Sequence, residues 1–90
     1  MNNGKQITAY TEAGFALEGT GGNCTAYVRN LSNGQQILIT GEHGPEAPRT
    51  ESEKVVCGLY GKDHSEALAE VLADSASEAV EQMRQQWGLN

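Results

Sequence analysis

The sequence has few cysteines, few cations and no long apolar run. Two cysteines, Cys24 and Cys57, are too few for a disulfide framework like those of small secreted domains. Six Lys and Arg residues against twelve Asp and Glu residues give a net charge of −6, which argues against direct binding to a phosphate backbone. Without a long apolar stretch or a signal-peptide pattern, we expect no membrane span and a cytoplasmic protein.

What is present suits one small globular domain. The chain has 90 residues, of which 38% are hydrophobic, so residues 1–90 are expected to share a single core. This composition is richer in apolar residues than that of a disordered acidic tail.

Runs of alternating apolar and polar residues predict an antiparallel sheet between residues 5 and 60. The runs are 5–10, 15–18, 24–31, 35–40 and 54–60. The first two fit either a hairpin or one bulged strand. Asn33-Gly34 predicts a hairpin between the third and fourth runs, because both residues tolerate positive φ. The last run is apolar on both faces, which predicts a central strand.

A long polar loop is predicted over residues 41–53. It contains two prolines and four carboxylates: Pro45, Pro48, Glu42, Glu46, Glu51 and Glu53. Loops of this length without regular structure are uncommon and are often functional or mobile.

The last third of the chain predicts one long amphipathic helix over residues 63–87. Its expected core-facing stripe lies within an arc of about 100° on a helical projection and consists of Leu68, Leu72, Ala76, Ala79, Met83 and Trp87. Asp63 is a suitable N-cap and Gly88 a suitable C-terminal stop. Asp74 to Ser77 have weak helix propensity, which indicates a possible kink or a break into two helices.

The opposite side of this predicted helix is acidic. It carries the candidate partner-binding residues Glu66, Glu70, Asp74, Glu78 and Glu81. Residues 63–90 contain six acidic residues and only Arg84 as a base, whereas residues 1–62 contain six acidic and five basic residues. Like charges four residues apart weaken a helix slightly, so the pattern fits a surface for a basic partner. It also fits a face that only keeps the protein in solution.

No catalytic or metal-binding pattern stands out. A site of Cys24, His43, Cys57 and His64 does not have the usual zinc spacings, and two buried thiols are the simpler interpretation. The glycine-rich residues 19–22 lack the Lys-Ser/Thr of a phosphate-binding loop. We therefore expect no catalytic residue, no metal and no cofactor, and a protein that is not an enzyme.

The expected fold class is α+β. A single antiparallel sheet of four to five strands has the long C-terminal helix packed on one face. The other face, with Tyr27 and Tyr60, is expected to stay partly exposed as a second contact surface or a homodimer interface.

The layout resembles small phage and prophage proteins. Strands are followed by a turn and by Asp63-His64-Ser65-Glu66-Ala67-Leu68-Ala69-Glu70, which opens an alanine-rich helix. In size, charge and layout the chain is similar to anti-CRISPR proteins. That resemblance implies an inhibitor of a CRISPR effector complex in the bacterial host, acting through acidic residues. Ser65-Glu66-Ala67-Leu68 also resembles the helix start of HicB-type antitoxins, although no helix-turn-helix follows Trp87.

Three functional hypotheses follow. The first is a non-catalytic inhibitor whose acidic residues bind a protein partner with a basic, nucleic-acid-binding surface. The second is a small accessory or structural subunit that dimerises or docks through the open sheet face. The third is a small enzyme or ligand-binding fold that uses the cysteines or histidines.

Overall fold

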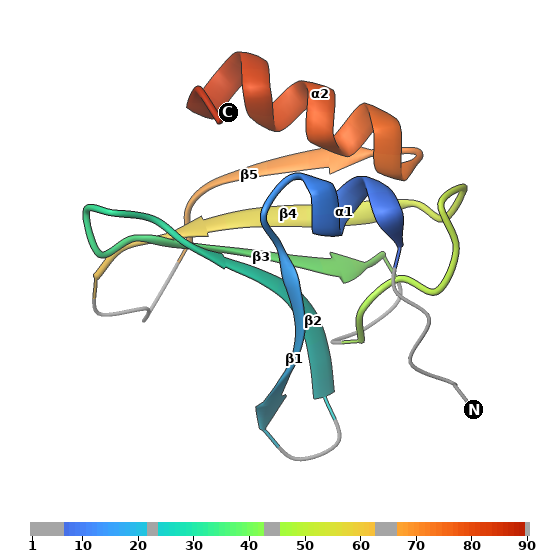
Figure 1. Ribbon diagram of the computed structural model, residues 1–90, viewed down its shortest axis with the longest axis horizontal. Helices are drawn as coiled ribbons and strands as arrows, with labels where there is room; N and C mark the ends of the chain where they lie inside the picture. The colour runs from blue at the N-terminus through green and yellow to red at the C-terminus, as the bar shows by residue number, and fades with distance from the viewer. Residues whose placement is uncertain (1–6, 22–23, 43–45, 63–66, 90) are drawn as a thin grey trace.

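Five antiparallel strands and two helices make up the fold in a computed structural model, which describes residues 7–21, 24–42, 46–62 and 67–89 (Figure 1). In chain order the elements are α1 (Thr8–Glu12), β1 (Ala16–Gly21), β2 (Cys24–Asn30), β3 (Gln36–Gly41), β4 (Val55–Tyr60), β5 (Ala67–Ala73) and α2 (Ala76–Trp87). The strands form one sheet in the order β1-β2-β3-β4-β5. The predicted α+β class, with one antiparallel sheet and a C-terminal helix, is confirmed.

The predicted β2–β3 hairpin is confirmed, and Gly34 is the last residue of its turn. Gly34 has a φ of 90°, and its N–H donates to the carbonyl of Leu31 over 3.1 Å. The side chain of Asn33 accepts from the N–H of Gln35 over 3.0 Å. The Asn-Gly pair therefore closes the turn through its backbone and side chain, which fixes the register of the two strands.

The first predicted strand is wrong, because residues 8–12 form the short helix α1. Ile7, Tyr10 and Ala13 are all buried, and their spacing of three residues matches one face of a helix. Arg29 of β2 donates to the carbonyl of Ala13 over 2.8 Å, at the C-terminal end of α1. This bond satisfies a carbonyl that the helix itself leaves free.

The predicted helix over 63–87 is also wrong in its first half. Residues 67–73 form strand β5, and residues 63–66 lie outside the described part of the chain. Val71 and Ala73 are buried while Leu72 is exposed, which is the period of two of a strand. The apolar strand β4 needs a partner at each edge for its backbone groups, and β5 supplies the second one.

The C-terminal helix is therefore α2 alone, and it begins at the predicted weak point. Ser75 is its N-cap, and the Ser75 hydroxyl accepts from the N–H of Glu78 over 3.2 Å. Gly88 ends the helix in a left-handed conformation with φ of 67°. Ala76, Ala79 and Met83 are fully buried, so this half of the predicted core stripe is confirmed.

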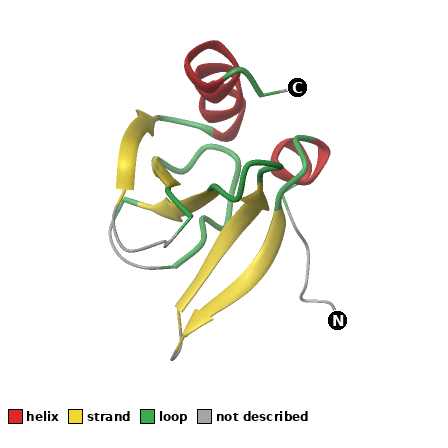
Figure 2. Ribbon diagram, turned by 90° about the vertical axis from the view of Figure 1, so that its left-hand side faces the viewer, coloured by secondary structure: helices red, strands yellow, loops and turns green. Residues whose placement is uncertain are grey.

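The core lies between one face of the sheet and the two helices. In Figure 2, α1 and α2 lie on the same side of the curved sheet. The sheet contributes Tyr27, Ile37, Ile39, Val55, Cys57 and Val71 to the buried cluster. Tyr27 was expected on the open face, but it belongs to the core, where its hydroxyl accepts from the N–H of Ile7 over 2.8 Å. No helix of the described residues is long and apolar enough to cross a bilayer.

Candidate functional site

The five predicted partner-binding carboxylates do not share a helix face. Glu66 lies outside the described residues. Glu70 is on β5, directly across from Gly58 of β4, and its side chain is exposed. Asp74 lies in the turn between β5 and α2, and Glu78 and Glu81 are on α2. Because α2 packs on the core side of the sheet and Glu70 is on the other side, these groups point to different surfaces.

The structure instead brings the long polar loop beside the start of α2. The N–H of Ala76 donates to the carbonyl of Glu51 over 2.7 Å. Gly41, Val55 and Ala73 lie side by side across three strands, so the loop and the β5–α2 turn lie at the same end of the sheet. We call this region the acidic end, and it contains Glu42, Glu46, Glu51, Glu53, Asp74 and Glu78, with Arg49 and Lys54 as its cations.

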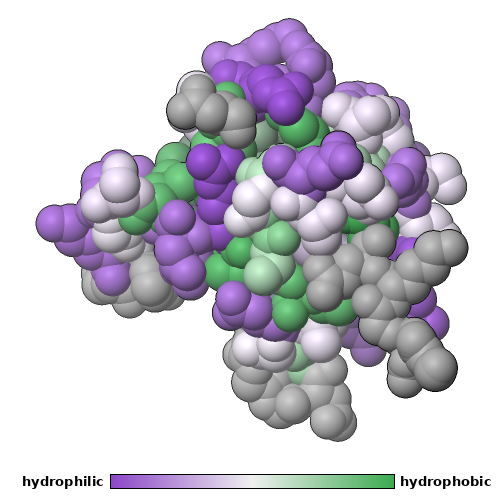
Figure 3. All heavy atoms as spheres, viewed as in Figure 1, coloured by the Kyte–Doolittle hydropathy of each residue, from purple (hydrophilic) through white to green (hydrophobic). Residues whose placement is uncertain are grey.

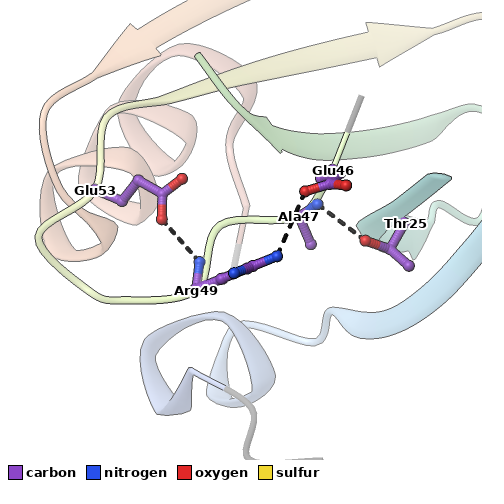
Figure 4. Close-up of polar contacts among 5 residues, drawn as sticks. All are labelled: Thr25, Glu46, Ala47, Arg49 and Glu53. Carbon is purple, nitrogen blue, oxygen red and sulfur yellow. Dashed lines mark hydrogen bonds and ion pairs between the residues drawn. The ribbon is translucent and has the colours of Figure 1, made fainter. Parts of the chain in front are cut away.

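The second part of the loop, residues 46–53, is held by its own polar contacts (Figure 4). The N–H of Ala47 donates to the hydroxyl of Thr25 over 3.1 Å, which ties the loop to β2. The carboxylate of Glu53 accepts from the N–H of Arg49 over 2.9 Å. The guanidinium of Arg49 lies 3.7 Å from the carboxylate of Glu46, an exposed ion pair that adds little stability. The loop therefore has a defined conformation over these residues.

The acidic end is not a metal site within the ranges that the structure describes. No three Asp, Glu, His or Cys residues there lie close enough together to hold an ion. His43 and His64, whose spacing with the cysteines does not predict a zinc site, fall outside those ranges. Cys24 and Cys57 are both free, and they lie on β2 and β4 with β3 between them. The two cysteines are therefore separated by two strand spacings of about 5 Å each, which is too far for a disulfide bond.

Two titratable groups in the core resist ionisation. Burial raises the pKa of the Cys57 thiol to about 12. Burial, together with the neighbouring Cys57 and Tyr27, also raises the pKa of Tyr10 above its ordinary value. The Tyr10 hydroxyl is buried and has no hydrogen-bond partner among the described residues. A neutral thiol and a neutral phenol in an apolar cluster are poor nucleophiles and poor bases, so they indicate packing and not chemistry.

The open face of the sheet carries apolar side chains, of which Leu68 and Leu72 are exposed and Leu38, Val56 and Tyr60 are half-buried. Strand alternation and register place Leu38, Val56 and Leu72 on this face, away from α1 and α2. The ring of Tyr60 lies against Gly58 on the same face, because a Cβ on Gly58 would come within 2.9 Å of that ring. Leu72 is 71% exposed, and Leu68, beside an irregularity in the β4–β5 register, is 59% exposed.

We call Leu38, Val56, Tyr60, Leu68 and Leu72 the open-face patch. Sequence periodicity had assigned Leu68 and Leu72 to the core stripe of a helix. Unlike this patch, the outer surface of α2 is mostly hydrophilic in Figure 3. A helix that covers the core with a polar outer surface is ordinary, whereas two exposed leucines on one strand indicate a contact surface.

Comparisons with protein-family models, with curated proteins and with solved structures found no match to this chain.

Proposed function

We propose that the protein is a non-catalytic binding protein that docks on a protein partner through the open-face patch. The observation that carries the proposal is the exposure of Leu68 and Leu72 on β5. Large exposed apolar side chains grouped on one face of a small domain are typical of protein interfaces.

The charge around the patch specifies the partner. Glu70 lies between Leu68 and Leu72 along β5, and its side chain is exposed on the open face. With a net charge of −6, the chain is attracted to a basic surface and repelled by an acidic one. The partner we propose has an apolar patch bordered by Lys and Arg, as on proteins that bind nucleic acid.

Occupying such a surface would inhibit nucleic-acid binding by steric and electrostatic competition. A CRISPR effector complex in the cytoplasm of a bacterial host is the partner that the resemblance in size, charge and layout favours. The acidic end supports the same mechanism, because its six carboxylates and two cations give it a local charge of −4. No chemical step by this protein is needed.

The test is a binding assay against a panel of purified CRISPR effector complexes, with labelled target DNA as competitor. We expect wild-type protein to bind a complex and to displace the DNA. Changing Leu68 and Leu72 together to Ser should weaken binding at least about tenfold, because each buried leucine contributes about 1.5–3 kcal/mol. Leu17→Ser is the matched control, since Leu17 is 37% exposed but lies on the opposite edge strand.

Charge variants separate the two surfaces. Glu70→Gln tests the patch, and the double change Glu46→Gln with Glu51→Gln tests the acidic end. We expect wild-type binding to weaken as salt is added. If a variant loses part of this salt dependence, the surface that carries its substitution contacts the partner. Unchanged DNA binding by every complex at saturating protein would sink the inhibitor proposal.

The second candidate is a small accessory or structural subunit that dimerises through the same face. The observation that favours it is the position of the exposed leucines on an edge strand, where another copy can approach. A concentration-dependent mass in analytical ultracentrifugation, insensitive to salt, would support this alternative over the inhibitor.

A further inference from the structure

The outer edge of β5 is a free strand edge. β5 is the last strand in the sheet order, and Figure 2 shows it at the left-hand side of the sheet, with α2 above it. Within the described chain, no backbone hydrogen bond reaches residues 67–73 other than those of the β4–β5 ladder. The other edge strand, β1, is interrupted by an irregularity between Gly19 and Gly21.

The ladder identifies which backbone groups face outward. The N–H of Glu42 donates to the carbonyl of Lys54, so these two residues form a hydrogen-bonded pair. Hydrogen-bonded pairs alternate along an antiparallel ladder, so Val56, Gly58 and Tyr60 of β4 direct their backbone groups to β3. The intervening residues of β4, namely Val55, Cys57 and Leu59, therefore direct their backbone groups to β5. They pair with Ala73, Val71 and Ala69. The residues left facing outward are Glu70 and Leu72.

The irregularity at Leu68 protects only the start of this edge, and residues 69–73 beyond it have no such protection. Proteins block a free edge with Lys, Pro, bulges or covering segments, since an open edge pairs with other chains. Residues 69–73 contain no Lys, Arg or Pro, and their register with β4 is regular. The side chains of Glu70 and Leu72 are both exposed on the open face, beside the outward backbone groups.

We propose that an extended segment of the partner protein adds to β5 as a sixth strand, with Lys or Arg opposite Glu70 and an apolar residue opposite Leu72. Main-chain hydrogen bonds to Glu70 and Leu72 supply the pairing, and the two side chains supply the selectivity. This proposal rests on the proposed protein-binding function and specifies how the partner is held.

Charge argues for a basic segment and against a second copy of the chain. Two β5 strands paired antiparallel about Glu70 would set the two Glu70 carboxylates opposite each other, and like charges directly opposite are destabilising. Each copy also carries a net charge of −6. A strand with Lys or Arg at that position turns the same carboxylate into an attractive contact.

The test uses a capped synthetic peptide, Val-Thr-Lys-Thr-Val-Thr-Lys, added to isotope-labelled full-length protein. We expect saturable slowing of amide hydrogen exchange at Glu70 and Leu72. The matched control peptide, with Glu in place of Lys, should give no slowing. Glu70→Gln should weaken binding of the Lys peptide about two- to fivefold, the size of one opposite-charge pair across strands.

Glu70→Pro tests the backbone contact itself. Proline removes the outward N–H of residue 70 without removing a bond to β4, so the fold should persist. We expect the thermal midpoint to stay close to that of wild type and peptide binding to be lost. If this variant fails to fold, the exchange of Glu70 and Leu72 in wild type still decides the question.

Three other outcomes would each overturn the proposal that a partner strand adds to β5. Slow exchange at Glu70 and Leu72 without peptide, together with the mass of a dimer, would make a second copy the occupant. Peptide-induced shifts at Val56 and Thr40 without amide protection on β5 would mean docking on the face alone, and the proposed function would stand. No response to the Lys peptide at millimolar concentration, with effector binding intact, would remove the strand mechanism only.

Discussion

Tyr10 and Tyr27 are in contact in the core, but they differ in the hydrogen bonding of their hydroxyl groups. The rings of Tyr10 and Tyr27 have centroids 4.9 Å apart. The Tyr27 hydroxyl accepts from the buried N–H of Ile7, whereas the Tyr10 hydroxyl has no partner in the part of the chain that the structure describes. The same chemical change, loss of one hydroxyl, should therefore have opposite effects at the two positions.

We expect Tyr27→Phe to destabilise the protein by about 1–3 kcal/mol, because it leaves the N–H of Ile7 buried without an acceptor. Tyr10→Phe should stabilise it by about 1 kcal/mol, since it removes a buried hydroxyl that makes no hydrogen bond. Urea unfolding followed by circular dichroism measures both changes. Equal losses of stability in the two variants would contradict this account of the core.

The buried thiol of Cys57 should make the fold sensitive to alkali. Its pKa is raised from 9.0 to about 12, so the unfolded chain loses this proton first as pH rises. Stability is therefore complete below pH 9 and falls between pH 9 and 12 by about 1.4 kcal/mol per pH unit. The raised pKa of Tyr10 adds a second loss of the same sign above pH 10.

Urea unfolding of wild type and Cys57→Ala at pH 8, 9, 10 and 11 tests this expectation. The variant should have lower stability at pH 8, because it loses packing, but a shallower decline between pH 9 and 10. Parallel declines in the two proteins would show that Cys57 does not titrate on unfolding.

At the scale of elements, local signals predicted β2, β3, β4, the first half of β1 and one hairpin, but not α1 or β5. β2, β3 and β4 have alternating patterns or β-branched residues, and Asn33-Gly34 fixes one turn locally. β5 is rich in Ala, Leu and Glu, which favour helix. It becomes a strand because β4 needs a second edge partner, a demand that no window of sequence around residues 67–73 contains.

The candidate sites were missed for the same reason. Once β5 was assigned to a helix, Leu68 and Leu72 fell on an apparent core stripe and Glu70 on an apparent acidic face. The meeting of the polar loop with the β5–α2 turn depends on the register that sets Gly41, Val55 and Ala73 side by side. In contrast, Ser75, Glu78 and Gly88 are local capping signals, and they are sufficient to locate the ends of α2.

Ser75 should be the residue that separates β5 from α2. Ser75→Ala removes the acceptor for the N–H of Glu78, and we expect a loss of about 1 kcal/mol of stability. Ser77→Ala is the comparison variant: the Ser77 hydroxyl lies 3.4 Å from that of Ser75 but accepts from no N–H of α2, so its loss should cost less. Thermal unfolding of both variants measures the difference. An equal loss at Ser77 would argue against a capping role for Ser75.

At the scale of the whole molecule, the concentration of negative charge at the acidic end should lower the thermal stability of the free protein. The acidic end concentrates carboxylates that repel one another, and salt screens this repulsion. We expect 0.5 M NaCl to raise the thermal midpoint by about 2–4 °C, equivalent to about 0.5 kcal/mol for a chain of this size. The double variant Glu46→Gln with Glu51→Gln should respond less. A salt response that is unchanged in the variant would place the repulsion elsewhere.

The order of the strands has a consequence for how the chain acquires its structure. Every strand pairs with its neighbour in sequence, so no hairpin has to wait for a distant segment. Each pair can form as soon as its second strand has left the ribosome. The late event is the meeting of α1 with α2, which joins the two ends of the chain over the core. We therefore expect folding within milliseconds, with the sheet register set before the hydrophobic interior is sealed.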